Sequence, residues 1–172
     1  MGDRLFVGGY FGAAGGAPAR AIAQWDGNSW SAMAVPIGTT STWVWSMASF
    51  DSDGVGPVGK ELYVGGRALR VGTTNVATAK WTGSTWTFSG DGSLGWQAVN
   101  MLRVIDLGGV PELHAARDDT TGSFNQWTMR LRNGVWRAVH NGLAVAQGGA
   151  SPINVRLFAL DPDLAGPEPE AL

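Results

Sequence analysis

The sequence has 172 residues, a formal net charge of −2 and no cysteine, and it contains neither a run of Lys or Arg nor an apolar run of roughly 20 residues. These features argue against a nucleic-acid partner, a membrane span, a disulfide framework and a thiolate metal site. The 26 glycines and 9 tryptophans, with only 15% charged residues, instead predict tight turns between short, aromatic-rich strands, which is typical of an all-β protein.

A five-residue segment recurs along the chain and divides it into three periods. The first copy, Leu5–Gly9, reads Leu-Phe-Val-Gly-Gly, the second is residues 62–66, and residues 113–117 form a third copy that has lost the glycines. Each period contains four short apolar stretches separated by Gly, Asn, Asp or Pro, which adopt turn conformations readily. We therefore expect four strands per period, named a, b, c and d. The repeat periods are residues 5–61, 62–112 and 113–171.

The strands follow one order in every period. The recurring segment is strand b, whose paired glycines allow close backbone approach, and a Gly-containing turn of the hairpin type links strands c and d. No stretch shows sustained apolar spacing at i, i+3 and i+4, so essentially no helix is expected. Strand c is predicted at residues 21–25, 76–81 and 127–131, strand d around Trp30, Trp86 and Trp136, and strand a at residues 45–50, 100–105 and 155–160.

Four-stranded units with a Gly-Gly pair in one strand and spaced aromatic residues further on are typical of β-propeller blades. The strings Ala14–Gly16, Ile22–Gly27 and Trp30, which follow the Leu-Tyr/Phe-Val-Gly-Gly segment, resemble the Gly-rich kelch-like repeats of large bacterial secreted or surface proteins. The resemblance spans the chain and is strongest in the first two periods. It implies an extracellular or cell-envelope display module, and it carries no catalytic motif.

The strand count predicts an open arc rather than a closed ring. Residues 1–172 form a single propeller segment of three blades, one of them split between the ends of the chain, with its strand a at residues 155–160. Closed propellers have about four to eight blades. Two arrangements therefore stay open: two copies join into a six-bladed ring, or the chain is a segment of a longer propeller.

Two short segments carry aspartates at alternating positions, Asp51 with Asp53 and Asp161 with Asp163. Such carboxylates could point oxygen atoms at one calcium ion, but the further ligands and the closing Glu of an EF-hand loop are missing. Turn formation is the interpretation that we favour for both pairs. Residues 90–95 match the G-x-G-x-x-G pattern of dinucleotide sites, but they lead into strand a rather than into a helix and are expected to be a turn.

The tryptophans fall into two groups. Those at equivalent repeat positions are expected to pack in the core, whereas Trp43 and Trp96 lie in the predicted d-to-a connections and are candidates for stacking on a ligand such as a sugar ring. Packing of the loops is the alternative for both. The residues assigned a structural role in the repeat are Gly8, Gly9, Trp25, Trp30, Gly65, Gly66, Trp81, Trp86 and Trp136.

The chain shows no cluster of catalytic residue types. It has two histidines, His114 and His140, and no Gly-x-Ser-x-Gly motif, so no cofactor and neither a hydrolase nor an oxidoreductase site is predicted. His114 occupies the repeat position of Phe6 and Tyr63, which predicts a structural role. The sequence predicts a non-catalytic module for protein interaction, self-assembly or surface display. The alternative is a carbohydrate-binding, lectin-like propeller with sites between the blades.

Overall fold

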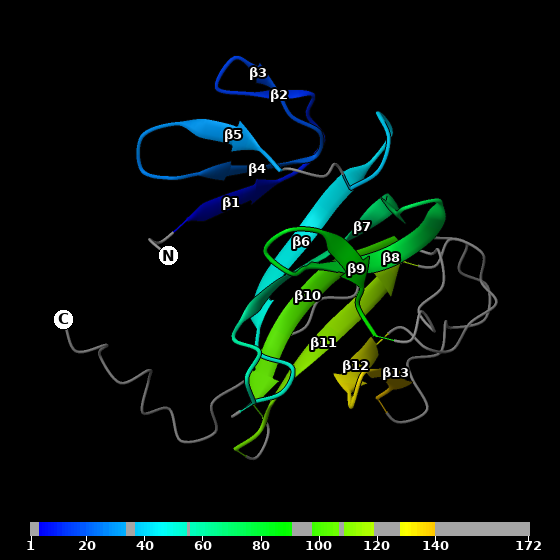
Figure 1. Cartoon of the computed structure of the whole chain (residues 1–172). Helices are drawn as coiled ribbons and strands as arrows, with labels where there is room; N and C mark the ends of the chain where they lie inside the picture. Colours follow the sequence, from blue (N-terminus) through cyan, green and yellow to red (C-terminus); the bar gives the residue numbers. More distant parts are fainter. Residues whose placement is uncertain are drawn as a thin grey trace, which may run out of the picture.

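The computed structural model describes residues 4–33, 37–54, 56–90, 98–106, 109–118 and 128–139 (Figure 1). Every regular element in these ranges is a β-strand, and all strand pairs are antiparallel. The predicted all-β class is therefore confirmed for this part of the chain. A search of the same residues for a helix long and apolar enough to cross a membrane found none.

The strands range from two residues in β2 and β3 to eleven in β7. Their bounds are β1 (Leu5–Gly8), β2 (Ala13–Ala14), β3 (Ala17–Pro18), β4 (Ile22–Trp25), β5 (Trp30–Ala32), β6 (Trp43–Phe50), β7 (Glu61–Val71), β8 (Thr74–Trp81), β9 (Trp86–Phe88), β10 (Ala98–Asp106), β11 (Pro111–Asp118), β12 (Thr128–Arg132) and β13 (Val135–Ala138).

The strands form three larger sheets, each ordered as the chain runs. The first sheet is β1-β4-β5, the second is β6-β7-β8-β9 and the third is β10-β11-β12-β13, while β2 and β3 form a separate two-stranded hairpin. In the first sheet, β1, β4 and β5 correspond to the predicted strands b, c and d. In the second sheet β6 to β9, and in the third sheet β10 to β13, correspond to the predicted strands a, b, c and d. The prediction of four-stranded antiparallel units is thus confirmed for the second and third sheets. The predicted strand at residues 155–160 lies outside the described residues.

The three sheets share one register, and this register explains the spacing of the tryptophans. In each sheet the leucine that begins the recurring segment pairs with a Trp or Leu near the end of strand c. That residue also pairs, on its other side, with the tryptophan of strand d. In the first two sheets the paired indoles contact each other, with ring centroids 5.4 and 5.2 Å apart. The three rows are Leu5–Trp25–Trp30, Leu62–Trp81–Trp86 and Leu113–Leu131–Trp136.

A β-bulge recurs at the same place in the first strand of the second and third sheets. The register shifts between Val44 and Ser46 in one sheet and between Val99 and Met101 in the other. Such a bulge bends the strand and increases its twist. Gly66 lies opposite the first bulge, where an added Cβ would lie 1.9 Å from the carbonyl oxygen of Trp43. Only glycine fits this close backbone approach.

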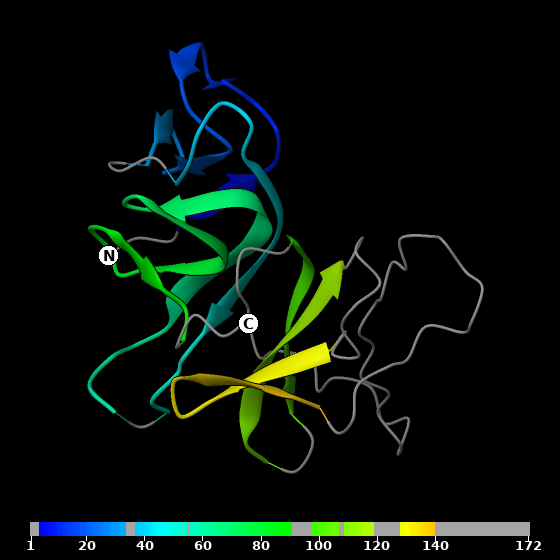
Figure 2. The same ribbon diagram turned by 90° about the vertical axis from the view of Figure 1, so that its right-hand side faces the viewer.

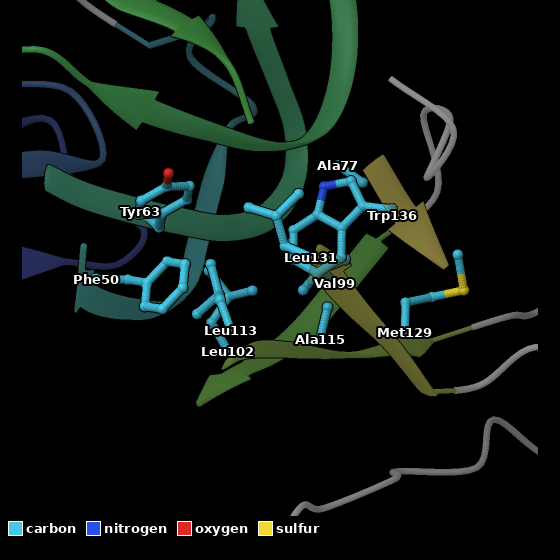
Figure 3. Close-up of a cluster of buried hydrophobic side chains, with 10 residues drawn as sticks. All are labelled: Phe50, Tyr63, Ala77, Val99, Leu102, Leu113, Ala115, Met129, Leu131 and Trp136. Carbon is cyan, nitrogen blue, oxygen red and sulfur yellow. The ribbon is translucent and has the colours of Figure 1, made fainter. Parts of the chain in front are cut away.

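Figures 1 and 2 show the three sheets following one another in chain order. The core lies between neighbouring sheets, in two clusters. The cluster between the first and second sheets includes Ile22 from β4 together with Val64 from β7. The cluster between the second and third sheets includes Tyr63 from β7 together with Leu113 and Trp136 from β11 and β13 (Figure 3).

The contact between one sheet and the next is repeated along the chain. A Cβ added at Gly8 would lie 2.4 Å from Val44 Cγ1 in the second sheet, and a Cβ added at Gly65 would lie 2.7 Å from Val99 Cγ1 in the third. Gly8 and Gly65 hold the same position in the recurring segment, and the two valines hold the same position before the bulge. The first glycine of each pair is therefore the residue that lets successive sheets approach.

Candidate functional site

The aspartates considered for calcium serve their own loop. Asp51 Oδ1 accepts hydrogen bonds from the backbone N–H groups of Asp53 (3.2 Å) and Gly54 (2.9 Å), and Asp53 Oδ2 accepts one from Val58 N (3.1 Å). This is the turn chemistry that short acidic side chains provide. Within the described residues no group of three or more His, Asp or Glu side chains is arranged to hold a metal ion. The other aspartate pair, residues 161 and 163, lies outside them.

Trp43, a candidate for ligand stacking, is 40% exposed and stacks on Tyr10, which is 58% exposed. The two ring centroids are 4.2 Å apart and the planes are tilted by 11°. One face of the Trp43 indole is therefore occupied by the chain's own phenol ring. Trp96 lies outside the described residues, as do residues 91–95 of the glycine-rich string, whose first residue, Gly90, packs against Trp136.

The residues assigned to the repeat lie at the structural positions described above. Trp86 and Trp136 are buried, while Trp25, Trp30 and Trp81 are half-buried. The indole N–H of Trp136 donates a hydrogen bond to the carbonyl of Ser89, which ties the third sheet to the second. Gly9, the second glycine of the first copy, accepts a backbone hydrogen bond from Val44 N (3.1 Å) and so joins the first sheet to the second.

Two clefts recur at equivalent places between successive sheets, at the end where strands a and b are linked and strands c and d turn. The first cleft lies between the first and second sheets and has a volume of about 660 Å³, and the second lies between the second and third sheets and has a volume of about 940 Å³. Both volumes are in the range of small-ligand sites. The first cleft is lined by Arg4, Phe6, Lys60, Glu61 and Trp81, among others, and the second by Asp51, Asp53, Lys60, Glu112 and Arg132, among others.

A charged pair recurs beside the clefts. In the second sheet Lys80 Nζ lies 2.7 Å from Glu61 Oε2, and in the third Arg130 lies 3.2 Å from Glu112 at the equivalent positions. Burial alone would lower the pKa of Lys80, but the hydrogen bond to Glu61 and the surrounding negative charge raise the pKa above its ordinary value. The ammonium group is therefore held in its charged form.

The first sheet departs from this pattern. At the equivalent positions its residues are Arg4 and Gln24, and Arg4 Nη1 donates a hydrogen bond to Gln24 Oε1 at 2.9 Å. No described carboxylate lies within 4.0 Å of either Arg4 or Lys60, which both line the first cleft. The first cleft therefore contains two cations without an ion-pair partner among the described residues.

Comparison of the chain with family models, curated proteins and solved structures found no match. The resemblance to kelch-like repeats therefore stays a prediction made from the residues alone.

His114 and Tyr63 hold equivalent positions, and both are buried. Burial lowers the pKa of His114, an effect that the nearby Glu112 opposes and Arg130 reinforces. Burial raises the pKa of the Tyr63 hydroxyl, an effect that the nearby Lys80 opposes and Glu61 reinforces. At neutral pH both side chains are thus uncharged, as the predicted structural role of His114 requires.

The outward face of the first sheet is open. Leu5 is 56% exposed and Val7 is 37% exposed, whereas Leu113 and Ala115, at the equivalent positions of the third sheet, are fully covered. β1 is also an edge strand of its sheet, while β7 and β11 each pair with a strand on both sides. Within the described part of the chain, strand b of the first sheet thus has an exposed apolar face and an unpaired edge, unlike strand b of the other two sheets.

Reasoning from the sequence missed the clefts and the charged pairs. The signal was present, because Glu61 and Glu112 both precede the leucine of the recurring segment, and Lys80 and Arg130 both precede the last residue of strand c. The pairing can be recognised only from the strand register, which places the acid and the base of each pair diagonally opposite on one face once strands b and c are aligned.

Proposed function

We propose that the chain is a non-catalytic assembly module, built as a segment of a kelch-like β-propeller, whose first sheet is covered by a further sheet of the same kind. The observation that carries this proposal is the exposure of Leu5 and Val7 at positions that are buried in the repeats that follow. The succession of three sheets with one register and one repeated glycine–valine contact supports it.

The second and third sheets indicate what such a partner would supply. Val64 in the second sheet is buried against Ile22 of the first, and Leu113 in the third is buried against Tyr63 of the second. A sheet placed in the same way before β1 would cover the side chains of Leu5 and Val7. Because both are only partly exposed, burying them would contribute roughly 1.5–3 kcal/mol in total to the association. A strand placed beside β1 would also satisfy the backbone groups along its edge.

The partner that we propose is a second copy of the chain, which would complete a six-bladed ring; the remainder of a longer propeller is the alternative. Closed two-fold assemblies are the commonest form of homo-oligomer, and a closed propeller ring leaves only short, protected strand edges. The resemblance to bacterial surface repeats supports display outside the cell or in the cell envelope.

The test is the molar mass in solution of the chain and of two matched variants. Sedimentation should give about 36 kDa, twice the 18.0 kDa of one chain. Val7→Lys places a charge in the proposed interface and should return the mass to that of a single chain without changing the circular dichroism spectrum. Val58→Lys, at an exposed position outside the strands, should leave the mass unchanged.

The same variants show how to interpret a parent protein that is not a dimer or that ignores the substitution. A Val7→Lys protein that associates as the parent does would contradict the proposal. A parent that is monomeric and does not bind an added dye for exposed apolar surface would contradict it equally, because the open face would then have no need of a partner. A monomeric parent that binds the dye, with Val7→Lys abolishing the binding, would support the longer-propeller alternative.

A second candidate function is glycan binding in the clefts between the sheets. The observation that favours it is the recurrence of two clefts, each beside a charged pair, at equivalent positions. A glycan array probed with the purified protein tests it, and an array without any saturable signal would contradict it.

A further inference from the structure

We propose that the first cleft binds an anionic saccharide, with a uronic acid unit as the recognised group. This inference rests on the second candidate function and names its ligand class, and it does not depend on self-association. It begins from the difference in charge between the two clefts. Among the described residues, the first cleft has two cations without an ion-pair partner and an apolar wall, whereas the charges that line the second cleft balance one another.

The cations of the first cleft come from one substitution in the repeat and one loop residue. Where the second and third sheets have Glu61 and Glu112, the first has Arg4, and its neighbour across the strands is the neutral Gln24 rather than a base. Lys60 enters the same cleft from the link before β7. Both cations lie in an open cleft, where a ligand carboxylate can reach them.

The one described carboxylate that lines the first cleft does not cancel these charges. Glu61 is held by Lys80 at 2.7 Å, so its negative charge is already neutralised. A carboxylate that enters the cleft would therefore meet the positive charges of Arg4 and Lys60. The guanidinium group of Arg4 suits this ligand, because its planar fork matches two carboxylate oxygens.

The remaining wall of the cleft fits the ring of a sugar. Phe6, Leu62 and Trp81 line it, and all three are half-buried, so part of each side chain is open to the cleft. The Trp81 indole is held against Trp86 at a centroid distance of 5.2 Å. A fixed indole presents a flat apolar face of the kind on which sugar rings stack.

The second cleft provides a contrast within the same chain. Its lining includes Asp51, Asp53 and Glu112 against the cations Lys60 and Arg132. Arg130 holds Glu112 at 3.2 Å, as Lys80 holds Glu61 in the first cleft. The two aspartates then balance the two cations, so this cleft has no excess of positive charge. An anionic sugar is expected to enter the first cleft and not the second.

The experiment uses nuclear magnetic resonance of the full chain, because each indole N–H gives a separate signal. The probe is digalacturonic acid, and the matched control ligand is its dimethyl ester, which keeps the rings and removes both charges. The Trp81 signal is assigned from its loss in Trp81→Phe. Saturable binding of the acid is expected to shift the Trp81 signal, and the ester is expected to cause at most a small shift.

Three variants test the charge. Arg4→Gln should weaken binding of the acid by roughly 10-fold or more, as expected for the loss of a charge-assisted hydrogen bond. The double variant Arg4→Glu with Gln24→Lys copies the acid–base pair of the other two sheets, so it should keep the fold and abolish binding. Arg67→Gln removes an exposed cation within β7 that does not line the first cleft, and it should leave the affinity unchanged.

The outcomes separate this inference from simpler explanations. Equal binding of acid and ester would overturn the anionic part, and binding of inorganic phosphate as tight as that of the acid, without a Trp81 shift, would overturn the saccharide part. An acid that does not bind at all would overturn the whole inference. If a glycan array shows neutral sugars bound while the acid is not, the glycan-binding function stands and only the present inference fails.

Discussion

Replacing Gly65 by alanine tests whether successive sheets pack through the glycine of the recurring segment. The added Cβ would lie 2.7 Å from Val99 Cγ1 and 3.2 Å from Leu102 Cγ, and Val99 is fully buried, so it has no solvent to move into. Gly65 does not have a positive φ, so alanine adds steric overlap without backbone strain. Overpacking of this kind costs about 1–3 kcal/mol, and the reduced freedom of the unfolded chain offsets about 0.4–1 kcal/mol of it.

We therefore expect a net loss of about 1–2 kcal/mol in the free energy of unfolding of Gly65→Ala, measured by chemical denaturation. For a chain of this size that corresponds to a decrease of roughly 2–8 °C in Tm. The control is Gly12→Ala, which makes the same substitution at a glycine without a positive φ and with no atom within 4 Å of the added Cβ. It should keep the stability of the parent or raise it by up to about 1 kcal/mol.

A double-mutant cycle with Val99→Ala identifies the contact itself. Val99→Ala alone should cost about 2 kcal/mol, because it removes two buried methyl groups and leaves a cavity. In the double variant the new Cβ at position 65 occupies part of that cavity, so the combined cost should be smaller than the sum by about 1 kcal/mol. Strictly additive costs, or a Gly65→Ala protein as stable as the Gly12→Ala control, would refute the packing between the second and third sheets.

Three further predictions concern single side chains. The pKa of His114 is lowered in the folded state, so its contribution to stability is complete above the unfolded value of 6.5 and is lost as the pH falls through the folded value. The Tm of His114→Phe should therefore change less with pH below 6.5 than the Tm of the parent does. Ser46 Oγ accepts a hydrogen bond from Leu102 N (2.9 Å) and donates one to Leu102 O (3.3 Å), so Ser46→Ala should cost about 1–3 kcal/mol and speed hydrogen exchange at the Leu102 amide, and unchanged exchange would contradict the link between the sheets. Asp51→Ala should lower stability by about 1 kcal/mol in urea denaturation, and calcium titrated into the parent should give no heat above dilution in a calorimeter; a saturable heat that the substitution removes would restore the calcium interpretation.

Much of the local structure could be predicted from the residues because it depends on short-range patterns. Glycine and asparagine in the c-to-d turns have positive φ, as at Gly27, Gly83 and Asn133, and such residues adopt this conformation at low cost. Strand c of the third period ends at Arg132, one residue beyond its predicted end, while its predicted first residue lies outside the described residues. Element boundaries are the least reliable part of such predictions, because they depend on pairing with the neighbouring strand.

The candidate site depended on contacts that no local pattern encodes. The sequence places Trp43 in a connection, but in the structure Trp43 is the first residue of β6, and the ring that stacks on it belongs to Tyr10, which follows β1 of the first sheet. Similarly, the cleft cations are Arg4 and Lys60, which are distant in the chain and meet only where the first and second sheets adjoin.

The all-β class, the order of the strands and the recurring segment could be predicted from the residues alone, since turn residues and apolar alternation act over a few residues. The packing of the sheets, the glycine that permits their approach, and the charges and apolar face that have no partner among the described residues became visible only in the folded chain. These features depend on how side chains fit against residues far away in the chain, and that fit is a property of the packed sheets rather than of any segment alone.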